Sequence, residues 1–121
     1  MPKNSDILLP NISHEGDSAV QESIGEKYKA DGYFSRSDGF HTVQYNLNGF
    51  IGTLYIQATL SLDPTQQDWF TLPETTHTSS STEDSKASGG FLYNFTGNYV
   101  WVRAVATDWT DGTVKSVLFN Y

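Results

Sequence analysis

Apolar and polar residues alternate over two stretches, 40–47 and 53–60, which lie on either side of the Asn48-Gly49 pair. Alternation with a period of two is typical of a strand that buries one face, and Asn-Gly is a strong signal for a hairpin turn. The pattern therefore predicts two antiparallel strands. The residues assigned to their buried faces are Val43, Tyr45, Leu47, Leu54, Ile56, Ala58 and Leu60.

Turn residues divide the next part of the chain. A third strand is expected to start at 68–72 and to be limited by Pro73, because proline cannot donate a hydrogen bond to a strand ladder. The stretch 77–90 is rich in serine and threonine and has few apolar residues. This composition predicts a long surface loop.

Alternation returns after this loop. Two strands, 91–96 and 98–107, are expected to form a hairpin through Gly97, and Asp111-Gly112 marks a turn into a final strand at 113–121. The sequence thus predicts an all-β fold over residues 39–121. With about six or seven short strands and no convincing helix, a single antiparallel β-sandwich, jelly-roll or immunoglobulin-like, is the natural architecture.

Residues 1–38 have a different character. They are rich in Asn, Ser, Asp, Glu and Gly, and their isolated apolar residues follow neither a helical nor a strand period. This composition is close to that of a flexible segment. We expect an extended N-terminal arm that precedes the β-domain.

Charge and cysteine content exclude several classes of function. Seven basic residues against fourteen acidic ones give a net charge of −7, and the basic residues form no patch, so nucleic acid and anionic membrane are not expected partners. The chain has no cysteine, so it has neither a disulfide framework nor a thiolate metal site. No apolar run approaches the roughly 20 residues that a membrane-spanning helix needs.

Neither catalytic nor metal-binding residues form a motif. The histidines at 14, 41 and 77 have no metal-binding spacing, and the aspartates at 63, 68, 108 and 111 all flank turns, where Asp is favoured for local hydrogen bonding. The serine run 79–81 lacks the context of a nucleophile. We therefore predict no catalytic residue, no metal and no cofactor.

Several aromatic residues are expected on outward strand faces. Tyr55, Tyr99 and Trp101 could offer flat platforms for stacking a sugar, or could simply pack under loops. A third interpretation is a subunit interface formed by Tyr99, Trp101 and Arg103, because Tyr, Trp and Arg are enriched at interfaces and Arg103 shares a strand face with Trp101. We favour the interface over sugar binding.

Four motifs carry a resemblance to a known class of proteins. They are GFIGTLYIQATL at 49–60, Asp-Trp at 68–69, FTGNYVWVR at 95–103 and Gly-Thr-Val at 112–114. In their order, they resemble small β-sandwich virion proteins of tailed bacteriophages, especially contractile-tailed phages of marine cyanobacteria. The resemblance covers about two thirds of the chain, from residue 38 to the C-terminus.

This resemblance implies a non-enzymatic structural role. The chain would be a repeated subunit on the head, neck, tail or baseplate of a virion, assembled in the cytoplasm of the host bacterium, with other virion proteins and copies of itself as partners. Proteins of this kind commonly reach a neighbour through an extension. The implied contact residues in the arm are Ile7, Leu8, Leu9 and Ile12. The alternative is a carbohydrate-binding module of the same fold that recognises host surface glycans.

Overall fold

The structure is a computed structural model that describes residues 5–9, 12–13, 21–25, 27–29, 40–81, 86–97 and 99–120. The strands are β1 (Ser5–Leu9), β2 (Ile12–Ser13), β3 (Gln21–Ile24), β4 (Tyr28–Lys29), β5 (Phe40–Thr59), β6 (Phe70–Ser79), β7 (Gly89–Thr96) and β8 (Trp101–Asn120), with one 3₁₀ turn, η1 (Gln66–Asp68). Every strand pair is antiparallel. The predicted all-β fold is confirmed.

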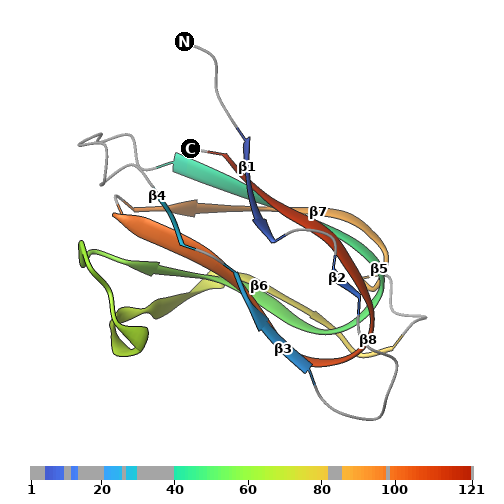
Figure 1. Cartoon of the computed structure of the whole chain (residues 1–121). Coiled ribbons are helices and arrows are strands. Elements are labelled where there is room, and N and C mark those ends of the chain that lie inside the picture. The colour runs from blue at the N-terminus through green and yellow to red at the C-terminus, as the bar shows by residue number, and fades with distance from the viewer. Residues whose placement is uncertain are drawn as a thin grey trace.

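Two long strands, β5 and β8, form the centre of the molecule. They pair with each other from Thr42 opposite Asn120 to Thr59 opposite Trp101, and both turn back halfway along their length (Figure 1). All strands belong to one hydrogen-bonded sheet. In the first half of this sheet, β7 pairs with 40–47 of β5; in the second half, β6 pairs with 52–58.

Glycines make the bend possible. Gly49 and Gly112 have positive φ angles of 66° and 89°, which favour glycine over residues with a side chain. A Cβ atom on Gly112 would lie only 2.1 Å from the carbonyl oxygen of Gly49. The hairpin predicted at Asn48-Gly49 is therefore wrong, and the turn predicted at Asp111-Gly112 does not begin a new strand, because each glycine bends a strand that continues beyond it.

The inside of the bend is filled by two rings. Phe50 and Trp109 are both fully buried, with ring centroids 5.5 Å apart. The indole Nε1 of Trp109 donates hydrogen bonds to the carbonyl oxygens of Asp111 at 3.0 Å and Gly112 at 3.2 Å. The backbone N–H of Phe50 also donates to the carbonyl of Ala87, at 2.9 Å. These contacts fix the bend from within and from the loop before β7.

The two halves of the sheet contact each other through aromatic and polar side chains. The Tyr45 hydroxyl in the first half donates to the carbonyl oxygen of Thr75 in the second half, at 2.8 Å. His77 of β6 lies 2.6 Å from the Tyr93 hydroxyl of β7 through its Nδ1 atom, and its ring packs on Phe91. Burial raises the pKa of Tyr45, which the hydrogen bond to Thr75 partly offsets.

The core has the composition that the alternation predicted. Val43, Tyr45, Leu47, Leu54, Ile56 and Ala58 are all buried. Leu60 is the exception, because β5 ends at Thr59 and Leu60 is 69% exposed. The other buried hydrophobic residues of the core are Leu8, Phe50, Leu72, Phe95, Val102, Ala104, Ala106, Trp109, Val114, Val117 and Phe119.

Two further strand predictions need correction. The strand β6 continues past Pro73 and includes His77, so the loop after it is shorter than predicted. Proline is tolerated there because pairing with β5 is irregular between Leu72 and His77. The strand β7 pairs with β5 instead of forming a hairpin with β8, so the connection through Gly97 leads from one half of the sheet to the other.

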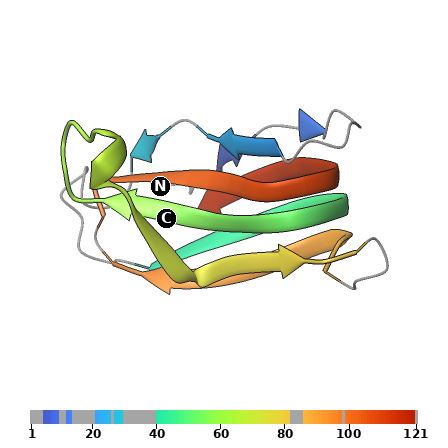
Figure 2. The same cartoon turned by 90° about the horizontal axis from the view of Figure 1, so that it is seen from below.

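Short N-terminal strands lie along the outer side of β8. The strands β1 and β2 pair with its second part, and β3 and β4 pair with its first part (Figure 2). Leu8 of β1 is only 1% exposed and belongs to the core. The described parts of the expected arm therefore extend the sheet of their own chain.

Candidate functional site

The end of the sheet opposite the bend exposes large apolar side chains. The segment 60–70, which comprises the connection from β5 to β6 and the first residue of β6, contains Leu60, Leu62 and Phe70, and their side chains are 69%, 67% and 68% exposed. We call these three residues the open-end surface. Most large apolar side chains of the described residues are buried in the core, so this group in one connection is unusual.

Local hydrogen bonds hold this segment in place. Thr65 caps η1 and forms a capping box with Asp68, whose carboxylate accepts from the backbone N–H of Thr65 at 2.7 Å. The indole Nε1 of Trp101 donates to the carbonyl oxygen of Leu62 at 2.9 Å. The apolar side chains are thus presented by a fixed backbone, which lowers the entropy cost of binding a partner.

An apolar pocket adjoins the surface. It has a volume of about 370 Å³, and Leu60 and Phe70 form part of its wall. The other lining residues are Ala58, Thr59, Ser61, Asp68, Leu72 and Tyr99. Burial raises the pKa of the Tyr99 hydroxyl, and the nearby Glu74 carboxylate raises it further, so this hydroxyl is neutral at ordinary pH. The pocket can accept an apolar side chain from another molecule.

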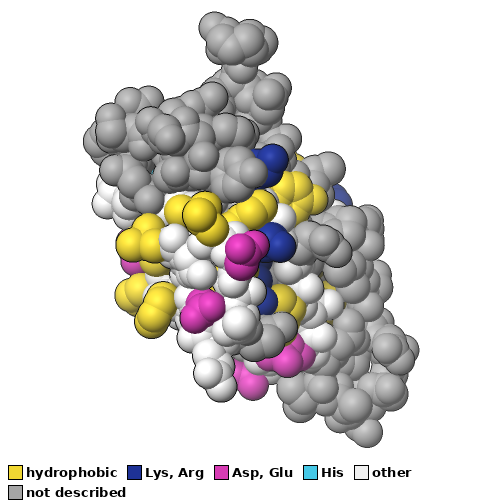
Figure 3. Space-filling view, turned by 60° about the vertical axis from the view of Figure 1, so that its left-hand side comes forward, with side chains coloured by type: hydrophobic (Ala, Val, Ile, Leu, Met, Phe, Trp, Pro, Cys, Tyr) yellow, Lys and Arg dark blue, Asp and Glu magenta, His cyan; other side chains and the backbone are white. Residues whose placement is uncertain are grey.

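A space-filling view brings this side of the molecule forward and shows hydrophobic side chains gathered on it, with basic and acidic groups between them (Figure 3).

Arg103 is 8% exposed, its guanidinium carbon lies 4.4 Å from the centre of the Trp69 ring, and its Nε donates to Gln57 Oε1 at 2.8 Å. Burial lowers the pKa of Arg103. Arg103 therefore supports the segment 60–70 from beneath.

The three aromatic residues predicted for sugar stacking are spread out. Trp101 pairs with Thr59, whereas Tyr55 lies four positions earlier on β5, about 13 Å along the strand. The Nζ atom of Lys27 lies 4.9 Å from the centre of the Trp101 ring. Tyr99 lines the apolar pocket instead. The structure therefore brings Tyr99, but not Tyr55, next to the open-end surface.

The four arm residues predicted for assembly lie in β1 and β2. Ile7 pairs with Leu118, Leu9 with Val117 and Ile12 with Val114, in each case through the backbone of β8. The buried Leu8 side chain already packs in the chain's own core. Residues 1–4, 10–11, 14–20, 26 and 30–38, the remainder of the expected arm, lie outside the described residues.

The polar residues that could carry chemistry have local structural partners. His77 Nε2 lies 2.8 Å from the Lys86 carbonyl, and His41 Nε2 lies 2.8 Å from the Gly97 carbonyl. The Asp111 carboxylate accepts from the Gly112 N–H at 2.8 Å. Among the residues that the structure describes, no three His, Cys, Asp or Glu side chains are grouped as for a metal ion. The same residues include no helix long and apolar enough to cross a membrane.

Sequence analysis missed the open-end surface. Leu60 was assigned to the buried face because alternation continues one position past the end of the strand. Phe70 was placed in the strand expected to start at 68–72, and neither it nor Leu62 was considered as a contact residue. A usable signal was present: two leucines lie in a connection that contains Pro64 and polar residues, and a phenylalanine follows at the start of the next strand. Connections lie on the surface, so apolar residues within them are candidates for contact.

Comparison with known proteins gives no match to a family model, a curated protein or a solved structure.

Proposed function

We propose that this chain is a non-enzymatic assembly protein whose copies bind one another through the open-end surface, as part of a tailed-bacteriophage virion. The observation that carries the assembly role is the exposure of Leu60, Leu62 and Phe70 within the segment 60–70. Grouped exposed apolar side chains mark sites where proteins associate. The pocket beside Leu60 and Phe70 offers a place for an apolar side chain of the neighbour.

The energies are of the right size for association. Each of these side chains, two-thirds exposed, would contribute roughly 1–2 kcal/mol on full burial. Two copies meeting symmetrically would bury six such side chains, or roughly 6–12 kcal/mol in total. This competes with the roughly 4–15 kcal/mol that association costs in lost freedom of motion. The surface therefore suits a contact that other particle proteins reinforce.

The virion setting is supported by the resemblance of the motifs at 49–60 and 95–103 to small phage structural proteins. In that setting, the chain would be a subunit on the head, neck, tail or baseplate, assembled in the host cytoplasm. Its partners would be its own copies and other virion proteins. The net charge of −7 agrees with binding to protein rather than to packaged nucleic acid.

The test is incorporation into particles. In the virus that encodes the chain, three forms would be compared by mass spectrometry of gradient-purified particles: wild type, the double variant Leu60→Asp with Phe70→Asp, and Leu92→Asp. Leu92 is the matched control because it is 66% exposed but lies on β7, away from the open end.

The wild-type and Leu92→Asp chains should be present in particles at equal copy number. The double variant should be depleted at least tenfold while it remains folded by circular dichroism. If particles purified from the wild-type virus did not contain the chain, the virion setting would be contradicted. Full incorporation of the double variant would contradict the role of the open-end surface.

A further inference from the structure

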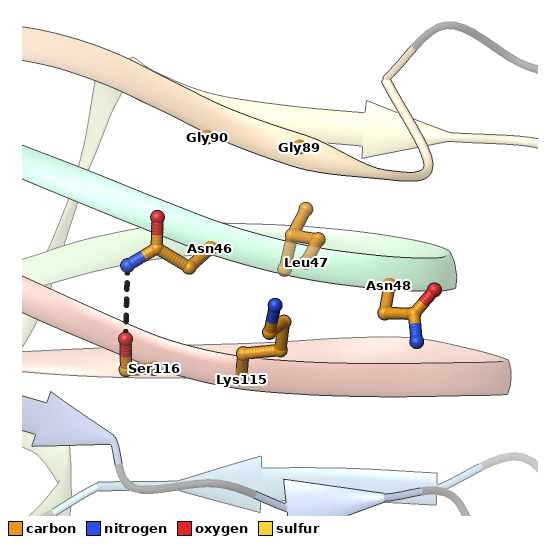
Figure 4. Close-up of a pocket in the computed structure, with 7 residues that line it drawn as sticks. All are labelled: Asn46, Leu47, Asn48, Gly89, Gly90, Lys115 and Ser116. Carbon is orange, nitrogen blue, oxygen red and sulfur yellow. Dashed lines mark hydrogen bonds between the residues drawn. The ribbon is translucent and has the colours of Figure 1, made fainter.

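A second surface, on the outer face of the first half of the sheet, contains a polar pocket of about 730 Å³. Its lining residues come from β5, β7 and β8, and they are Asn46, Leu47, Asn48, Gly89, Gly90, Lys115 and Ser116 (Figure 4). The volume is in the range of pockets that bind small ligands. The pocket lies away from the open-end surface and has a different chemistry.

A β-bulge points two polar side chains toward this pocket. Asn46 pairs with Ser116 and Leu47 pairs with Val114, so Lys115 is an extra residue in β8. Val114 and Val117 are both buried, while Lys115 is exposed and Ser116 is partly exposed. Without the bulge, strict alternation could not place Lys115 and Ser116 outward together.

Glycine keeps the opposite side of the pocket open. Gly90 of β7 pairs with Asn46, and a Cβ atom added to Gly90 would lie 3.2 Å from Asn46 Oδ1. Any side chain at position 90 would therefore cover the Asn46 amide. Glycine inside a strand often marks a place where a ligand approaches closely. Gly90 fits this role, since it is exposed and on the outer face.

The polar groups are held in a fixed row. Gln44 Nε2 donates to Asn46 Oδ1 at 2.8 Å, and Asn46 Nδ2 donates to Ser116 Oγ at 3.0 Å, as Figure 4 shows for the second bond. The Ser116 hydroxyl therefore keeps its own proton to donate, and the Asn46 amide keeps one further N–H and one acceptor site. Asn48 is exposed beside them.

The chemistry of this row points to a class of ligand. The lining offers hydrogen-bond donors and acceptors in alternation, one ammonium group and no carboxylate. An anion such as phosphate would use donors alone, whereas each sugar hydroxyl both donates and accepts. We propose that this pocket binds a saccharide, with the Asn46 amide, the Ser116 hydroxyl and the Lys115 ammonium as its hydrogen-bonding groups.

The experiment uses the full chain, fluorescently labelled, on an array of neutral and acidic oligosaccharides from bacterial and other surfaces. Wild type would be compared with Gly90→Val, which fills the pocket beside Asn46, and with Leu92→Ala, an exposed residue two positions along the same strand face. Lys115→Ala is a second pocket variant; because Lys115 is exposed, its replacement preserves the fold.

Wild type and Leu92→Ala should bind the same subset of saccharides. Gly90→Val and Lys115→Ala should each weaken that binding at least fivefold, while nuclear magnetic resonance spectra report a folded chain. An array without any wild-type signal would overturn the proposal, and so would saccharide binding that Lys115→Ala leaves unchanged. Neither result depends on the open-end surface, so this proposal and the assembly role fail separately.

Discussion

The bend and the open end of the sheet both contain large apolar side chains, but they use them differently. At the bend, Phe50 and Trp109 are fully buried and pack on each other inside the turned strands. At the open end, Leu60 and Phe70 are more than two-thirds exposed, at the two ends of a connection that hydrogen bonds hold in place. One end completes its packing within the chain, while the other leaves large apolar side chains exposed.

This difference follows from what each end must achieve. The bend has to bring two strands around a tight corner, so it needs glycine for close approach and bulky rings to fill the space within. The open end has only to connect β5 with β6, which a short polar turn would do. Apolar side chains there stabilise the fold little, and this is why we assign them to binding.

The largest expected effect breaks the bend. Gly112→Ala should lower the free energy of unfolding by roughly 4–6 kcal/mol, because backbone strain at a positive φ angle and overlap with the Gly49 carbonyl add together. Gly49→Ala is the matched control, since its φ is also positive but no atom lies within 4 Å of the added Cβ. It should cost about 1–2 kcal/mol. If both variants lost the same free energy of unfolding in urea denaturation, the close approach of Gly112 to the Gly49 carbonyl would be contradicted.

The next prediction compares the two ends directly. Trp109→Ala should cost about 3–5 kcal/mol of stability, because it removes a fully buried ring and leaves a cavity. Phe70→Ala should cost less than about 1 kcal/mol, because its ring is already 68% exposed. Both would be measured by urea denaturation of the full chain. Similar losses for the two variants would mean that the open end is part of the folding core.

A smaller effect concerns the contact between the halves of the sheet. Tyr45→Phe should cost about 1–2 kcal/mol at neutral pH, because the buried Thr75 carbonyl loses its donor. Circular dichroism during urea denaturation would measure this loss. A loss below about 0.3 kcal/mol would mean that the hydrogen bond is solvated or absent.

The same variant tests the pKa of Tyr45. Burial raises this pKa above the ordinary value of 10.0, so the folded chain keeps the proton after the unfolded chain has lost it. The contribution of this group to stability should therefore be constant below pH 10 and should fall above it, by about 1.4 kcal/mol per pH unit. Tyr45→Phe should reduce that slope. An unchanged slope would contradict the burial of the hydroxyl.

Sequence alone located the strand faces well and the connections poorly. Alternation identified the buried side of β5 from Val43 to Ala58, because a period of two depends only on neighbouring residues. It could not tell a hairpin from a bend at Gly49, because both need the same glycine. The partner of that glycine, Gly112, lies 63 positions away. The pairing of these two distant segments therefore determines that the strand bends at Gly49 instead of ending in a hairpin.

The candidate sites show the same limit. Leu8 lies in a polar segment without period, and only its place beside β8 explains its burial. The polar pocket depends on the extra residue at Lys115, and a bulge has no signature in the alternation of a single strand. Arg103 was expected on the same strand face as Trp101, but its side chain is only 8% exposed, because Trp69 from the segment 60–70 lies over it.

The open-end surface is tested most directly by the mass of the purified full-length chain in solution. Size-exclusion chromatography with light scattering, over a range of concentrations, would compare wild type with the double variant Leu60→Asp and Phe70→Asp, and with Leu92→Asp as control. We predict that wild type and Leu92→Asp exceed the single-chain mass of 13.5 kDa as concentration rises, while the double variant stays at that mass. A wild-type chain that remains monomeric at every concentration, or a double variant that associates equally well, would contradict the account.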